Sequence, residues 1–186
     1  MNTPTHFLLT AALGRPLKQR GVNPIRSAWW WGSLAPDIPL YLLTLGGWVY
    51  YCLILGWDPT EAFRYMFRQL FFHNPFWIAS HNVLHSPTVL LLGLGWNGWV
   101  QGSRWVRWFF SACLLHTLVD IPVHVTDGPL LFFPFNWSFR WRGPVSYWDP
   151  RYGGDWFFGV ELALNGLLLL YLAGPWLRRR LRGRVR

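Results

Sequence analysis

Four long apolar runs constrain the fold of this chain more than any other feature. Residues 38–57 and 83–102 contain no formally charged side chain, and two further apolar runs cover residues 108–125 and 156–177. A helix of about 20 apolar residues crosses the hydrocarbon core of a bilayer, and it satisfies its own backbone hydrogen bonds there. Only 13% of the residues are charged, against about 25% in a soluble protein. We therefore predict an all-α, multi-pass membrane protein with three to four transmembrane helices.

The segments outside these runs complete a single domain. Residues 4–14 predict a short N-terminal helix. Residues 126–155 are rich in Gly, Pro and aromatic side chains and predict a packed, aromatic-rich loop, because they are too apolar for a disordered linker. We predict one membrane-embedded helical domain over residues 1–177.

A basic tail, residues 178–186, follows the last apolar run and contains six Arg. Such a tail after a membrane span is typical of the cytoplasmic side, where it binds anionic lipid headgroups. We expect no nucleic acid as a partner, since no other part of the chain resembles a nucleic-acid-binding module.

A stripe of metal-ligand side chains ends the third apolar run. At 100° per residue, His116, Asp120, His124 and Asp127 fall within about 80° of one another on a helix. Imidazoles and carboxylates are costly to desolvate in a membrane, and a metal ion would compensate that cost. The alternative is a polar seam that is hydrogen-bonded to neighbouring helices. Glu161 in the last apolar run is an intramembrane acid, which indicates a functional residue by default, and Asn165 one turn away or helix termini are its alternative structural partners.

Short motifs spread over residues 5–135 resemble those of the membrane-bound metal-dependent hydrolases, a bacterial inner-membrane family distantly similar to zinc-dependent phospholipase C. The resemblance depends on the order of the motifs. They are Thr5-His6, Gly32-Ser-Leu-Ala-Pro36-Asp37, His85-Ser86, His116-x-x-x-Asp120, and Gly128 with Pro134-Phe135.

The resemblance implies a metal-dependent hydrolase in the bacterial cytoplasmic (inner) membrane that acts on a phosphoester or ester of a lipid-like substrate. The expected metal ligands are His6, Asp37, His85, His116 and Asp120. Imidazole and carboxylate together suit zinc, our first choice, and also iron or manganese. We expect Asp127 and His124 to be catalytic, with one carboxylate as general base for water. Arg140 and Arg142 are expected to bind the substrate by receiving its phosphate.

The expected ligands can bind one metal ion only if the membrane topology places them on the same side of the bilayer. If all four runs cross, the positive-inside rule places both termini, and so the C-terminus, in the cytoplasm. His6 and Asp37 would then lie about 30 Å from His85 and the stripe. A joint site therefore predicts that residues 38–57 do not cross the bilayer or are strongly tilted.

Two other functions compete with hydrolysis. In one, the chain is a non-catalytic accessory or assembly subunit of a larger membrane protein complex and retains a hydrolase-like fold. In the other, intramembrane His residues bind a haem or chlorin, which would colour the purified protein.

Overall fold

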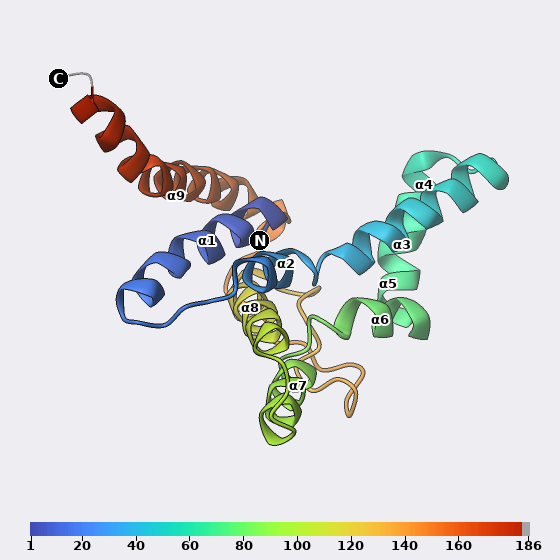
Figure 1. Ribbon diagram of the computed structural model, residues 1–186. Coiled ribbons are helices and arrows are strands. Elements are labelled where there is room, and N and C mark those ends of the chain that lie inside the picture. Colours follow the sequence, from blue (N-terminus) through green and yellow to red (C-terminus); the bar gives the residue numbers. More distant parts are fainter. Residues whose placement is uncertain (184–186) are drawn as a thin grey trace.

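The computed structural model describes residues 1–183, and this part of the chain is helical without a β-strand (Figure 1). The only β pairing among these residues is an isolated bridge between Leu130 and Arg140. The all-α prediction is therefore confirmed. The main helices are α1 (Thr3–Gln19), α2 (Arg26–Leu34), α3 (Ile38–Trp48), η1 (Val49–Ile54), α4 (Pro59–Tyr65), η2 (Met66–Leu70), α5 (Phe71–His73), α6 (Pro75–Asn82), α7 (Pro87–Trp99), α8 (Arg104–Asp120) and α9 (Gly154–Gly183).

Two helical segments in the described chain are long and apolar enough to cross a membrane. They are Arg104–Val123, which joins α8 to a short 3-10 turn, and Gly154–Trp176 of α9. A third is added if α2 and α3–η1, which meet at a bend of 45°, count as one span. The expected fourth span is not confirmed, because α7 has 13 residues and so is about 20 Å long, shorter than the bilayer core.

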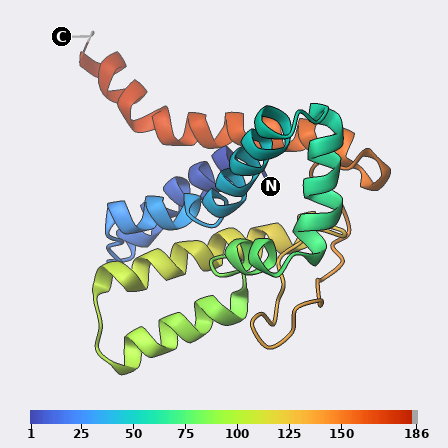
Figure 2. The ribbon, with the colours of Figure 1, turned by 90° about the vertical axis from the view of Figure 1, so that its right-hand side faces the viewer.

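The helices stack in layers in the order α9, α1, α2, α8 and α7 (Figures 1 and 2). The crossing of α2 and α8 is close because Gly32 has no side chain. A Cβ at this position would lie 2.3 Å from the Phe109 carbonyl oxygen and 2.8 Å from Ala112 Cβ. Small residues permit such close approaches between membrane helices. This crossing holds the C-terminal end of α2 beside the middle of α8.

Residues 38–73 form a helical hairpin, in which α3–η1 runs out from the layers and α4–η2–α5 returns (Figure 1). Met66, Phe71 and Trp77 form its buried core together with partly buried side chains such as Leu40. The outward positions are apolar and exposed, including Leu42, Leu53 and Ile54. An apolar outer surface of this kind suits contact with lipid.

The aromatic loop was predicted over residues 126–155, to pack as a lid or to lie in the membrane interface. In the structure it occupies residues 124–153 and packs against α6 and α7. Leu130 and Phe133 are buried against Ile78. Asn82 connects the two parts, since its Oδ1 accepts a hydrogen bond from the Leu130 N–H at 2.8 Å. The loop therefore forms a fixed wall beside the end of α8.

The basic tail continues α9 as far as Gly183. Residues 184–186 lie outside the part of the chain that the structure describes. Binding of anionic lipids by the tail and its cytoplasmic side stay predictions.

Candidate metal centre

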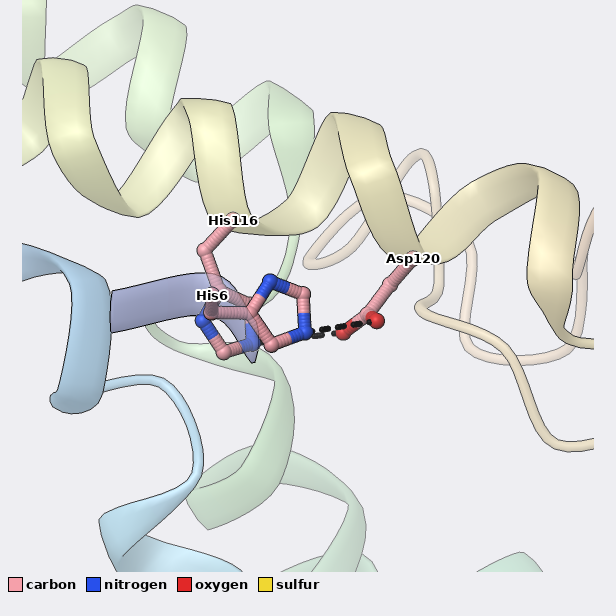
Figure 3. A group of neighbouring side chains, drawn as sticks. All are labelled: His6, His116 and Asp120. Atoms are coloured by element: carbon pink, nitrogen blue, oxygen red, sulfur yellow. Dashed lines mark ion pairs between the residues drawn. The ribbon is translucent and has the colours of Figure 1, made fainter. Parts of the chain in front are cut away.

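The structure brings all five predicted metal ligands into one buried cluster. Asp37 precedes α3, His85 lies in the turn between α6 and α7, and His6 lies on α1. His116 and Asp120 are one turn apart on α8 and point to the same side (Figure 3). The bend between α2 and α3 brings Asp37 to the others, so the expected separation of about 30 Å across the bilayer does not arise.

Four of these side chains, Asp37, His85, His116 and Asp120, form what we call the donor quartet. The Nε2 atoms of His85 and His116 are 3.2 Å apart. Asp37 Oδ1 lies 3.4 Å from the Nε2 of His116 and 3.7 Å from that of His85. Asp120 Oδ2 lies 3.2 Å and 3.4 Å from the same two atoms. A tetrahedral zinc site with bonds of about 2.0–2.1 Å has ligand–ligand edges of about 3.3–3.4 Å, so the quartet has the spacing of a metal site.

Hydrogen bonds outside the quartet orient its members inward. His116 Nδ1 lies 2.8 Å from the Ser33 carbonyl oxygen, which can only accept, so Nδ1 carries the proton. With Nδ1 held by this carbonyl oxygen, Nε2 is the ring atom that faces the quartet. Metal-ligating His residues are commonly fixed in this way. Thr3 Oγ1 donates to Oδ2 of Asp37, which leaves Oδ1 for the quartet.

His6 lies against the quartet from the side of α1. Its ring stacks on that of His116 with centroids 3.6 Å apart and an interplanar angle of 13°. Its Nε2 is 2.9 Å from Asp120 Oδ1 (Figure 3), and the Met1 amino group also donates to this oxygen. Burial lowers the pKa of His6 to about 4, so the ring is neutral at pH 7. His6, His116 and Asp120 thus form a second group of donors able to hold a metal ion.

Several buried ring nitrogens of this cluster have no hydrogen-bond partner in the described structure. They are the Nδ1 atoms of His6, His81 and His85. Buried polar atoms are normally paired. The donor set, its spacing and these unpaired atoms together fit a divalent metal ion bound by imidazole and carboxylate.

His124 and Asp127 do not continue the stripe of α8, so the prediction of four ligands on one helical face is wrong for these two. Pro122 ends the regular helix, and a 3-10 turn, Ile121–Val123, turns the chain away. His124 Nδ1 then donates to the Asp120 carbonyl oxygen at 2.9 Å, and burial lowers the pKa of His124. The Asp127 carboxylate accepts a 2.6 Å hydrogen bond from Trp148 Nε1.

A cavity of about 670 Å³ adjoins the quartet and lies between the hairpin and the aromatic loop. Asp37, His85 and Asp120 line one end, and His124 and Asp127 line the wall that the loop forms. This volume is within the range of small-ligand sites. The cluster is therefore accessible from a cavity although its residues are buried.

The two predicted phosphate-binding residues do not line this cavity. Arg140 donates to the Gly128 carbonyl oxygen and lies over the Phe71 ring, 5.1 Å from its centroid. Burial lowers its pKa to about 10, so it stays charged at pH 7. Arg142 lies over the Tyr152 ring instead. Both cations therefore serve the packing of the loop in this structure.

Two features of the site were missed by reasoning from the sequence. The Ser33 carbonyl oxygen orients His116, but a backbone contact between α2 and α8 leaves no signal in residue types. The cavity is lined by Arg64 and Arg68, and their spacing of four residues on an amphipathic segment was the available signal.

Glu161 is a second buried carboxylate, and its exposed fraction is only 2%. It accepts hydrogen bonds from the backbone N–H of Asn2 at 2.7 Å, from Asn2 Nδ2 at 2.6 Å and from Thr5 Oγ1 at 2.7 Å. Glu161 therefore joins α9 to the start of α1. The expected partner Asn165 does not contact it by a hydrogen bond, since Asn165 Oδ1 has no partner among the described residues.

The fold and the cluster together define a class: a helical membrane protein with a buried histidine–carboxylate centre beside a cavity. The chain belongs to the YdjM inner membrane protein family, whose family model matches residues 1–181. It is therefore an inner-membrane protein, as predicted. No curated protein and no solved structure that was compared matches the chain.

Proposed function

We propose that this protein is a membrane-embedded, metal-dependent hydrolase that cleaves a phosphoester or ester of a lipid-like substrate. The observation that supports this most is the donor quartet, in which the two imidazole Nε2 atoms lie 3.2 Å apart and each lies 3.2–3.7 Å from one carboxylate oxygen of Asp37 and one of Asp120. Lone pairs at this distance repel one another unless a shared proton or a metal cation lies between them.

Asp37, His85, His116 and Asp120 would hold the ion, and His6 adjoins it through Asp120. Zinc is the first choice for this donor set, with iron and manganese as alternatives. When bound, such an ion polarises a phosphoryl or carbonyl oxygen and acidifies water at the site.

His124 and Asp127 are placed to move protons in the cavity. The His124 Nδ1–H is tied to the Asp120 carbonyl oxygen, so the neutral ring has its basic lone pair on Nε2. Asp127 stays fixed by Trp148 and presents a carboxylate to the same cavity. We assign to these two side chains the acceptance of a proton from the attacking water and its return to the leaving group.

The test is elemental analysis of protein purified in mild detergent, followed by turnover of phospholipids in mixed micelles with and without a chelator. We expect one or two equivalents of metal in the wild type and none in His116→Ala/Asp120→Ala. The matched control is His73→Ala, because His73 is exposed and lies outside the cluster.

Metal-free wild-type protein would contradict the proposal. The cluster would then be a hydrogen-bonded polar seam, and the accessory-subunit alternative would follow. Bound metal without turnover of any lipid ester would support the metal centre but contradict the proposed hydrolase activity.

A further inference from the structure

The end of the cavity formed by the hairpin is cationic, whereas the end formed by the quartet is acidic. Arg64 and Arg68 lie four residues apart on α4 and η2, so they lie on one face of the returning arm. Both line the cavity that contains Asp37 and Asp120.

The two arginines are not neutralised by the protein. Neither forms an ion pair within the described part of the chain, whereas Arg151, the third arginine of the cavity, is bound to Asp149 through a 2.7 Å contact between Nη2 and Oδ2. The two acids of the loop that line the cavity also have partners: Asp127 accepts a hydrogen bond from Trp148, and Asp149 forms the ion pair with Arg151. Two arginines without an ion pair in the described structure therefore line the same cavity as Asp37, His85 and Asp120.

The wall beside these arginines is apolar and comes from the same hairpin. Leu40, Phe67, Phe71 and Phe72 line the cavity next to them. The outer surface of the hairpin is also apolar and exposed, with Leu42, Leu45 and Leu53. An anionic ligand with an apolar chain could bind the two arginines with its charged group and the apolar side chains of the hairpin with its chain.

We propose that Arg64 and Arg68 form an anion-binding subsite of this cavity and that its ligand is an amphiphile with a phosphate group. Guanidinium groups bind phosphate oxygens through paired, charge-assisted hydrogen bonds. A cavity of about 670 Å³ accommodates the phosphate end of such a molecule, while its apolar chain continues along the hairpin. The inference rests on the proposed function only in naming this ligand as the substrate.

The experiment measures binding of dodecyl phosphate by calorimetry to the full chain in dodecyl maltoside micelles, with chelator-treated and metal-loaded protein in parallel. Arg64→Gln/Arg68→Gln should weaken binding about tenfold or more in both preparations, because two charge-assisted hydrogen-bonding groups are lost. Arg64→Lys/Arg68→Lys should retain intermediate binding, which excludes misfolding as the cause.

The matched control is Arg104→Gln/Arg107→Gln, because these arginines are also exposed and close in sequence but lie outside the cavity. A loss in the control equal to that in Arg64→Gln/Arg68→Gln would overturn the subsite and indicate general attraction to a cationic surface. Binding of inorganic phosphate as tight as that of dodecyl phosphate would overturn the amphiphile. If the proposed function fails because no metal binds, the comparison in chelator-treated protein still decides this inference.

Discussion

Two carboxylates are buried among the helices of this protein, and their surroundings differ in kind. Glu161 on α9 meets hydrogen-bond donors at the start of α1, at 2.6–2.7 Å. Asp120 on α8 meets three imidazoles, whose Nε2 atoms lie 2.9–3.4 Å from its oxygens. The Glu161 carboxylate is therefore satisfied by donors of the protein itself. Asp120 accepts from the Met1 amino group, but the rings of His6 and His85 beside it each keep an Nδ1 without a partner among the described residues.

The difference shows how a structural acid can be told from a ligand-binding one. A buried carboxylate with enough donors stabilises the packing of the helices that supply them. Imidazole and carboxylate atoms placed against one another need a proton or a metal cation between them, and such a site is costly until one is present. We therefore propose that Glu161 serves folding and that Asp120 serves metal binding.

The largest effect is expected from removing the charge of each acid in turn. Asp120→Asn should weaken metal affinity by at least about 100-fold, because it removes a proposed ligand. Loss of a group that only supports a ligand lowers metal affinity by about 10–100-fold. Glu161→Gln should retain the wild-type metal content. Metal analysis of the two purified variants checks this, and equal loss in both would show that the two regions are not distinct.

The next effect concerns the contact between α2 and α8 that orients His116. Gly32→Ala introduces a Cβ at 2.3 Å from the Phe109 carbonyl oxygen, so α2 must move and take the Ser33 carbonyl oxygen with it. We expect a loss of unfolding free energy of about 2–3 kcal/mol and about 10–100-fold weaker metal binding.

Gly46→Ala on α3 is the control for this substitution, because a Cβ there meets no atom within 4 Å. It should change neither unfolding nor metal binding beyond about 0.5 kcal/mol. Unfolding in mixed micelles of dodecyl sulfate and dodecyl maltoside, with metal titration, measures both. Wild-type metal affinity in Gly32→Ala would show that the Ser33 contact does not support the site.

The helices and one pair of residues in the site could be predicted from the sequence. The apolar runs predicted helices, because a chain in lipid has few other ways to satisfy its backbone. They overstated the number of spans, since hydropathy over residues 83–102 does not reveal that α7 begins at Pro87 and ends at Trp99. Spacing along α8 revealed His116 and Asp120 as a pair.

The other residues of the site depended on tertiary structure. His6, Asp37 and His85 were recognised by the order of short motifs, but the bend that brings Asp37 to α8 left no periodic signal. A helix terminus was expected as one partner of Glu161, but that it is the start of α1 could not be predicted, because the docking of α1 on α9 cannot be derived from the local sequence of either helix. Arg140 and Arg142 were expected to bind the substrate because they lie in the aromatic loop, whereas the arginines that line the cavity with the cluster include Arg64 and Arg68 of the hairpin.

A smaller effect is expected where Glu161 joins α1. Thr5→Val removes the donor that lies 2.7 Å from Glu161 Oε1 and leaves the size of the side chain nearly unchanged. We expect a loss of about 1–2 kcal/mol in unfolding free energy, since the bond has a charged acceptor. A double-mutant cycle with Glu161→Gln should give a coupling energy of about 1 kcal/mol. Additive effects of the two substitutions would contradict the structural assignment of Glu161.

The smallest effect is expected at Asn165, one turn from Glu161 on the same helix. Its Oδ1 is buried without a hydrogen-bond partner in the described structure, so the side chain contributes desolvation cost and no compensating bond. Asn165→Leu should therefore leave the unfolding free energy within about 0.5 kcal/mol of the wild type or raise it, since removing an unsatisfied polar group is neutral or stabilising. Metal content should not change. A loss of more than about 1 kcal/mol, the typical net value of a hydrogen bond, would mean that Asn165 has a partner in the membrane. The polar positions of α9 would then serve contacts outside this chain as well as the docking of α1.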